Sequence, residues 1–377
     1  MSTSKLPNLF DFATSELSQD AVLAYLFSWA DREWADHPQH KVVHELGERM
    51  LRRLVNLAAD ASGKDDPLKS RTTLEVRVKA QRMRIDVLVE IDDDLALLIE
   101  DKTMTGEHGK QLRRYVESLE EHYEKDNQPR EVFAVYVKTG NEAHAYREKS
   151  IPCGICRRPD VLDILSEYPE SGNTIVEDFR RHLQRLESDT LSYMVKEPAE
   201  WNWRAVEGYY LHLEDRLPKS NPKWGYVSNP SGGFIALWLH VLQVESMGCN
   251  LYLQIHQGVR LTVRASSRGN GKVSSKQQWR VYEACRATAD QGRIPGLQVS
   301  KFGRYGGGRS AAIADVEFIN KDASHIAMTP DGRKATGYIA MTPDGSPDLD
   351  STVERVGQAV TFLEGAARTL EAESPPP

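Results

Sequence analysis

The strongest constraint on the fold of this chain is a pair of apolar runs separated by a short acidic turn. The first run is Arg82–Ile91, the turn is Asp92–Asp94, and the second run is Leu95–Lys102. Two such runs joined by three residues predict a β-hairpin. In a hairpin with a three-residue loop, Asp86 lies directly opposite Glu100, with their Cβ atoms about 5 Å apart. The hairpin therefore sets two like charges side by side within apolar strands.

A cation is the simplest partner for these two carboxylates. Mg²⁺ prefers oxygen ligands and is typically held by one or two carboxylates, with water and substrate phosphate as further ligands. Lys102 lies two residues beyond Glu100, so strand alternation places its ammonium on the same face. The alternative is that all three side chains are solvated charges at a strand end. The apolar residues around Asp86 and Glu100 disfavour it, because carboxylates in a covered sheet need a partner.

The elements around this hairpin predict an α/β domain with a mixed sheet flanked by helices. We place the domain at residues 1–195. Apolar residues at helical spacing or in strand-like runs indicate the following order: helices at 18–30 and 42–59, strands at 73–79, 83–91 and 95–99, a helix at 108–123, a strand at 132–138 and a helix at 178–194.

A second domain of the α+β class is predicted for residues 200–377, beyond a boundary near 198–202. A chain of 377 residues is long enough for two or three domains. The predicted elements are a helix at 203–217, a hairpin of strands 251–255 and 259–264, a helix at 275–289, strands at 297–302 and 311–318, and a helix at 351–371.

Charge is distributed unevenly along the chain. The net charge is −7, which by itself disfavours a nucleic-acid partner. However, residues 251–314 carry eleven Lys or Arg against only Glu283 and Asp290, and such asymmetry indicates a polyanionic partner. No apolar run reaches the length of a membrane helix, and residues 1–7 do not resemble a signal peptide. We therefore expect a cytoplasmic protein with no membrane partner.

Two glycine-rich stretches lie within this basic window, at Ser267–Lys272 and Lys301–Arg309. Glycine lets a backbone approach a phosphate closely, and Arg304 and Arg309 offer charge to it. The alternative is that both stretches are surface loops. Cys153 and Cys156 form a single Cys-x-x-Cys pair. Because a closed zinc site needs four ligands, this pair leaves zinc binding open.

The hairpin and its flanks resemble the PD-(D/E)XK nuclease superfamily, whose core is restriction-endonuclease-like. Asp86, thirteen intervening residues and Glu100-Asp101-Lys102 match its signature. Three further segments resemble a branch of standalone bacterial nucleases: an opening helix beginning at Glu16, an Arg-Ile-Asp strand that includes Arg84, and a helix that carries Gln111 and Tyr115. Ile85 stands where the superfamily name has proline, which leaves the carboxylate unchanged.

The resemblance implies a role for each of these residues. Asp86, Glu100, the backbone carbonyl of Asp101 and Glu16 are expected to ligate Mg²⁺ or Mn²⁺. Lys102 and Gln111 are expected to position the attacking water, and Arg84 and Tyr115 to bind substrate. Arg304 and Arg309 are expected to bind substrate because they lie in the basic, glycine-rich window, which the resemblance does not cover. For Gln111 and Tyr115 the alternative is plain helix surface and packing, and for Glu16 it is an acid favoured by the helix dipole.

The leading hypothesis is a metal-dependent nuclease that hydrolyses phosphodiester bonds. The resemblance favours DNA over RNA and allows a role in defence against foreign DNA. The alternative from another class is a sensor of nucleic acid or a phospholigand with a silent nuclease-like core. A ribonuclease on the same core, a homo-oligomer and a regulatory partner all stay open.

Overall fold

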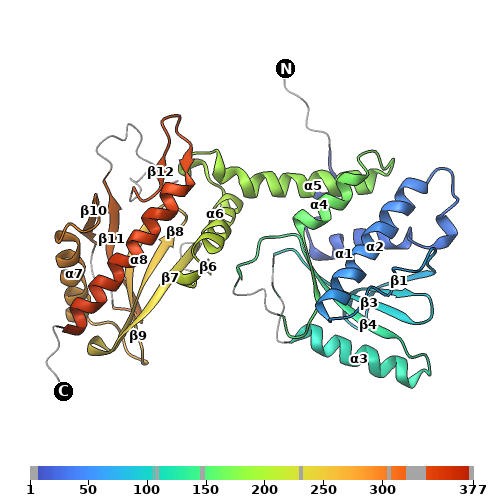
Figure 1. The fold of residues 1–377 in the computed structure, drawn as a ribbon, viewed down its shortest axis with the longest axis horizontal. Coiled ribbons are helices and arrows are strands. Elements are labelled where there is room, and N and C mark those ends of the chain that lie inside the picture. Colours follow the sequence, from blue (N-terminus) through green and yellow to red (C-terminus); the bar gives the residue numbers. More distant parts are fainter. Residues whose placement is uncertain are drawn as a thin grey trace. The chain divides into compact units, whose positions relative to one another are not determined.

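The computed structural model describes residues 7–104, 106, 110–144, 149–228, 232–303, 307–319 and 337–372 (Figure 1). The chain divides into two compact units, Met1–Ser188 and Asp189–Pro377. The division lies a few residues before the boundary expected at 195–200, within the last helix of the first unit. Among the described residues, no helix is both long and apolar enough to span a membrane.

The first unit is built on a mixed five-stranded sheet. Its strand order is β1-β2-β3-β4-β5, with β1 to β3 antiparallel and β3 to β5 parallel. The predicted mixed sheet flanked by helices is confirmed. The strands are β1 (Val76–Arg82), β2 (Ile85–Ile91), β3 (Leu95–Lys102), β4 (Glu131–Lys138) and β5 (Gly154–Arg157).

Helices cover both faces of this sheet. Val87 and Val89 of β2 pack into one core with α1 and α2, whereas Leu88 packs into a second core with α3 (Figure 1). Side chains alternate between faces, so strands covered on both sides are apolar throughout. The helices are α1 (Glu16–Ser28), α2 (Lys41–Ala61), α3 (Gln111–Lys125), α4 (Arg158–Glu167) and α5 (Thr174–Leu191).

The hairpin between β2 and β3 has the predicted three-residue loop. Ile91 pairs with Leu95 and Val87 with Ile99, so the next position in register sets Asp86 against Glu100. The strand predicted at 83–91 is wrong at its start. Met83 and Arg84 form a two-residue turn after β1, and both have positive φ, as a type I′ hairpin turn requires. Arg84 therefore lies in a turn and not in a strand.

The second unit contains an antiparallel six-stranded sheet of order β10-β11-β9-β8-β7-β6. This confirms the predicted α+β class and the hairpin, which is formed by β8 and β9. The elements are α6 (Trp203–Arg216), β6 (Lys223–Val227), β7 (Phe234–Val244), β8 (Cys249–His256), β9 (Arg260–Ser267), α7 (Ser275–Asp290), β10 (Leu297–Lys301), β11 (Ser310–Phe318), β12 (Ala340–Met341), β13 (Pro347–Asp348) and α8 (Leu349–Ala372).

Short 3₁₀ helices connect several of these elements in both units. They are η1 (Leu9–Asp11), η2 (Arg32–Trp34), η4 (Ser192–Met194), η5 (Pro198–Glu200), η6 (Pro218–Ser220) and η7 (Glu245–Met247).

The helices of the second unit pack on one face of its sheet. Trp224 of β6 donates a hydrogen bond to Glu214 of α6, and Arg355 of α8 lies over the ring of Phe318. Strand alternation sends their neighbours to the other face. Trp238 of β7 and Tyr252 of β8 belong to that second face and are half-buried.

Gly47 sets how closely α1 and α2 approach. A Cβ at Gly47 would overlap the backbone carbonyl oxygen of Leu26 in α1. We expect Gly47→Ala to lower the stability of the first unit by about 1–3 kcal/mol, because backbone cannot move aside cheaply. Gly357 of α8 is the matched control, since a Cβ there meets nothing within 4 Å. Gly357→Ala should raise stability by about 0.5–1 kcal/mol.

Differential scanning calorimetry of the full chain would measure both effects. An unchanged melting temperature for Gly47→Ala would show that the two helices are not held at this contact.

Candidate active site

Three predicted site residues meet where β2 begins and β3 ends. The Nζ atom of Lys102 lies 2.6 Å from Oε1 of Glu100 and 3.4 Å from Oδ2 of Asp86. The backbone N–H of Asp101 donates a 3.0 Å hydrogen bond to the same oxygen of Asp86. The hairpin register thus brings two carboxylates and one ammonium together, and Lys102 offsets the repulsion between the acids in this structure.

Glu16, the first residue of α1, reaches the same cluster. Its Oε1 atom accepts a 3.0 Å hydrogen bond from the backbone N–H of Thr103, directly after β3. Its Oε2 atom lies 4.0 Å from Nζ of Lys102. The predicted opening helix therefore carries its glutamate to the end of β3, where the side chain remains one-third exposed.

Burial and neighbouring charges shift the pKa values of both Glu100 and Lys102, the closest ion pair of the cluster. Glu100 is completely buried, and desolvation raises its pKa to about 7, with Asp86 adding to the rise and Lys102 opposing it. Burial alone would lower the pKa of Lys102, but its hydrogen bond to Glu100 and the charges of Glu100, Asp86 and Glu16 raise the value overall. Perturbed groups of this kind cluster at functional sites. Lys102 stays protonated and acts as a hydrogen-bond donor.

Asp101 contributes its backbone and its side chain in different places. Its carbonyl oxygen accepts a 2.9 Å hydrogen bond from Nζ of Lys102, within the cluster. Its carboxylate instead points toward α1 and accepts a 2.5 Å hydrogen bond from the side chain of Gln19. The carboxyl groups of Asp101 and Asp20 contact each other. Burial, then the charge of Asp20, raise the pKa of Asp101.

The sequence analysis assigned no role to Asp20. Burial and the charge of Asp86 raise its pKa to about 6, and the side chain of Gln81 donates a 3.0 Å hydrogen bond to it. Asp20 stands four residues after Glu16 on α1, which is the spacing of neighbours on one helix face. That spacing is the signal that could have identified it.

A second lysine missed by the sequence analysis is Lys138 at the end of β4. It pairs in register with Lys102 across the parallel strands, and its Nζ donates a 2.9 Å hydrogen bond to the carbonyl of Thr103. Burial lowers its pKa to about 8. The strand predicted at 132–138 ended on this lysine, but its pairing with β3 could not be read locally.

The predicted substrate-binding residues do not all join this cluster. Gln111 and Tyr115 share one face of α3 and are joined by a 3.1 Å hydrogen bond. Within the described residues, no hydrogen bond links either of them to Asp86, Glu100 or Lys102. Arg84 is exposed in its turn. Arg309 is exposed just before β11 in the second unit, and Arg304 lies outside the described residues.

The donor set of the cluster fits a hard divalent cation. Asp86, Glu100 and Glu16 supply carboxylate oxygens, which Mg²⁺ and Mn²⁺ prefer. The buried Oε2 atom of Glu100 has no hydrogen-bond partner among the described residues, and such an atom is costly unless something binds it. Over the same residues, no three His, Cys, Asp or Glu side chains are already arranged around a metal position. In this structure the Lys102 ammonium supplies the positive charge beside the carboxylates of Asp86, Glu100 and Glu16.

The cysteine pair does not form half of a zinc site in this structure. Cys153 packs into the α3 core and Cys156 into the α1 and α2 core, so the two side chains lie on opposite faces of the sheet. Both thiols are free and buried, and burial raises the pKa of Cys156 to about 12.

Comparison with known proteins identifies a family for the first half of the chain. A family model described as the PD-(D/E)XK nuclease superfamily matches residues 7–195, half of the chain. A comparison with curated proteins gives no match, and a comparison with solved structures gives none either.

Asp20 makes the stability of the metal-free protein depend on pH. Its raised pKa means that the protonated form stabilises the fold fully below about pH 4, and that this contribution is lost as pH rises through about 6. Asp20→Asn stays neutral at every pH. At pH 7.5 we therefore expect Asp20→Asn to melt at a higher temperature than wild type, by about 2–4 °C for each kcal/mol that the charged Asp20 carboxylate costs the fold. At pH 4 we expect the two proteins to melt at the same temperature.

Calorimetry in EDTA would measure this difference. Asp93→Asn is the matched control, because the Asp93 side chain is 92% exposed in the β2–β3 loop. A melting difference for Asp20→Asn that does not grow with pH would contradict the assignment.

Proposed function

The chain belongs to the PD-(D/E)XK nuclease superfamily, and from this premise we propose that it is a nuclease that hydrolyses phosphodiester bonds with Mg²⁺ or Mn²⁺. The observation that carries the proposal is the convergence of Asp86, Glu100 and Lys102: Nζ of Lys102 lies 2.6 Å from a carboxylate oxygen of Glu100 and 3.4 Å from one of Asp86. An arbitrary pair of strand-end acids would be solvated, whereas Glu100 is completely buried.

Each residue of the cluster has a proposed role. Asp86, Glu100, Glu16 and the carbonyl oxygen of Asp101 would hold the cation. When bound, it would polarise the phosphate and lower the pKa of a coordinated water. Lys102 donates hydrogen bonds from a protonated Nζ, so it would orient the attacking water or a phosphate oxygen and stabilise charge there.

Gln111 and Tyr115 have a lesser place in this proposal. Their mutual hydrogen bond orients the Gln111 amide at the start of α3. Helix α3 packs on the face of the sheet that carries Glu100. Gln111 would therefore help to position the attacking water once substrate is bound, and Tyr115 would contact the nucleic-acid substrate. Hydrogen bonds at apo active sites are often incomplete before substrate binds.

The second unit would hold the nucleic acid. On the second face of its sheet, Tyr252 lies opposite Arg264 in register, and Trp238 stands on the neighbouring strand. Aromatic rings stack with bases and arginine binds phosphate, a combination that suits single-stranded nucleic acid. Arg264 Nη2 donates a 3.3 Å hydrogen bond to Ser310, and its Nε has no partner among the described residues. Arg309 directly precedes β11, which begins at Ser310.

DNA is the proposed substrate, and defence against foreign DNA the proposed context. Both rest on the family resemblance and on the basic window of the second unit. The proposed location for such a protein is the cytoplasm. RNA is the alternative substrate on the same core, and a panel of DNA and RNA strands separates the two.

Removal of either charge at the cluster should abolish cleavage. With Mg²⁺ and single-stranded, duplex or circular DNA, we expect Asp86→Asn and Lys102→Gln to cut at least about 100-fold more slowly than wild type. Asp93→Asn, at the exposed end of the same hairpin, should cleave normally. EDTA should stop cleavage in wild type. Metal-dependent cleavage that persists in both cluster variants, with melting temperatures matching wild type, would refute the site.

Arg264 should contribute to binding that weakens with salt. We expect Arg264→Gln to bind a fluorescent single-stranded oligonucleotide more weakly and to reduce the slope of log affinity against log salt by about 0.7, the value for one phosphate contact. Arg286→Gln is the control, because Arg286 is exposed and paired with Glu283 on α7. Anisotropy titrations at several KCl concentrations would measure both. An unchanged slope for Arg264→Gln would exclude this contact.

A further inference from the structure

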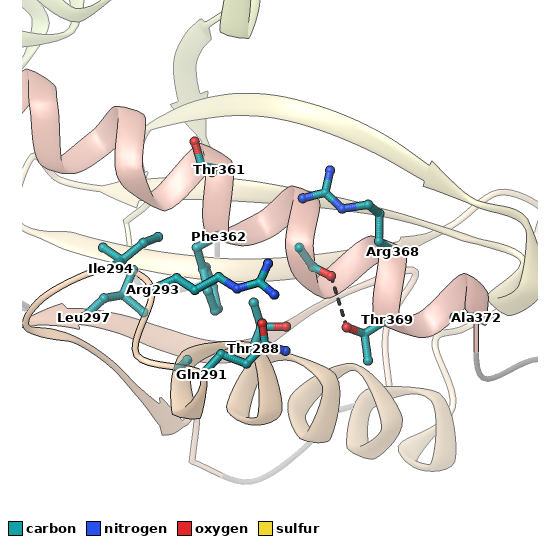
Figure 2. Close-up of a pocket in the computed structure, with 12 residues that line it drawn as sticks. Thr288, Gln291, Arg293, Ile294, Leu297, Thr361, Phe362, Arg368, Thr369 and Ala372 are labelled. Atoms are coloured by element: carbon teal, nitrogen blue, oxygen red, sulfur yellow. Dashed lines mark hydrogen bonds between the residues drawn. The ribbon is translucent and has the colours of Figure 1, made fainter.

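A cavity of about 340 Å³ lies between α7 and α8 in the second unit (Figure 2). Its walls come from the last turn of α7, the segment that follows it, and the second half of α8. The volume falls within the range of small-molecule sites, about 300–1,000 Å³.

Gly365 allows the two helices to approach closely at this cavity. A Cβ at Gly365 would lie only 2.9 Å from Cγ2 of Thr288 on α7. Thr369 is held by a 3.2 Å hydrogen bond from its hydroxyl to the carbonyl of Gly365, shown as a dashed line in Figure 2. The wall of α8 is therefore fixed by packing and by hydrogen bonding.

Two arginines supply the charge of the cavity. Arg293, after α7, and Arg368, on α8, both line the cavity. Figure 2 shows the Arg293 guanidinium in the space between the helices and the Arg368 guanidinium alongside α8, on the side away from α7. Among the residues that the structure describes, no Asp or Glu lines the cavity. Within the part of the chain that the structure describes, neither guanidinium forms an ion pair or hydrogen bond. Arg286 on the same helix, by contrast, is paired with Glu283.

The remaining lining provides an apolar wall. Phe362 and Leu297 are buried and face the cavity together with Ile294. The Gln291 amide lies beside them (Figure 2). A ligand that matches this lining has an anionic group at one end and a flat apolar body with hydrogen-bonding edges at the other.

We propose that this cavity binds a nucleoside phosphate, with the phosphate held by Arg293 and reached by Arg368, and the base against Leu297 and Phe362. Guanidinium groups bind phosphate oxygens through paired N–H donors. Both arginines are exposed, so the long side chain of Arg368 can turn toward an anion held by Arg293. The nucleoside phosphate can be a free nucleotide or the 5′-phosphorylated end of a strand. The inference goes beyond the proposed nuclease activity, since binding requires no cleavage.

The two arginines have one competing role. The C-terminal ends of α7 and α8 lie at this cavity, and cations stabilise the carbonyl end of a helix. In that role the arginines would raise the melting temperature and bind no ligand. A binding measurement separates the two roles.

The experiment uses the full chain carrying Lys102→Gln, in EDTA, so that no probe is cleaved. Isothermal titration would compare AMP, ATP, adenosine, inorganic phosphate, and a short oligonucleotide with a 5′-phosphate or a 5′-hydroxyl. We expect AMP, ATP or the 5′-phosphorylated strand to bind more tightly than adenosine or inorganic phosphate alone. Arg293→Gln and Arg368→Gln should each weaken that binding roughly tenfold or more. Arg286→Gln should leave it unchanged.

Preference for the free nucleotides would identify a small-molecule effector, and preference for the 5′-phosphorylated strand would identify a strand-end site. Both results support the cavity as a nucleoside-phosphate site. The inference is overturned if no phosphate-bearing probe binds, or if the two arginine variants bind as well as Arg286→Gln.

DNA cleavage would be measured separately on the chain with Lys102 intact. Because the cavity residues are not part of the Asp86, Glu100 and Lys102 cluster, loss of one function leaves the other testable. Absence of cleavage with intact nucleotide binding would refute the nuclease and not the cavity.

Discussion

One buried ammonium organises the first unit of this protein. Lys102 contacts Glu100 and Asp86 and lies 4.0 Å from Glu16, so strands β2 and β3 and helix α1 all depend on its charge. Removing one partner from a buried ion pair costs several kcal/mol, about 3–5, because the remaining charge is left uncompensated. The same arrangement holds the carboxylates of Asp86, Glu100 and Glu16 where a bound cation would also stabilise them. The side chains that stabilise the fold are therefore the same ones that would bind the metal.

Local patterns predicted the parts of the fold that have a simple buried face. Leu46, Met50 and Leu54 of α2 repeat at four-residue spacing and are all buried, so the helix was predicted nearly to its ends. The three-residue loop followed from the acidic turn between two apolar runs. In contrast, β5 has only four residues, and β7 has an irregular pairing near His240 that breaks its alternation. Neither was predicted.

The site followed the same division. Asp86, Glu100 and Lys102 lie on adjacent strands of one hairpin, so their proximity was contained in a short stretch of sequence. Asp20 and Lys138 belong to α1 and β4, and only the packing of α1 and the parallel pairing of β3 with β4 bring them near. The positions of Arg304 and Arg309 could not be predicted, because glycine and arginine in a sequence indicate charge without fixing where the side chains lie.

The parallel pairing of β3 with β4 determines when the cluster is complete during folding. Lys102 lies beside Lys138, yet α3 intervenes between the two strands, and Glu16 comes from the beginning of the chain. Closing such long loops costs entropy before any contact is gained, so pairings of this kind form late. A nascent chain can therefore bring Asp86, Glu100 and Lys102 together from the hairpin alone, but Glu16 and Lys138 join them only when α1 and β4 pack. The complete site and the finished tertiary structure form in the same step.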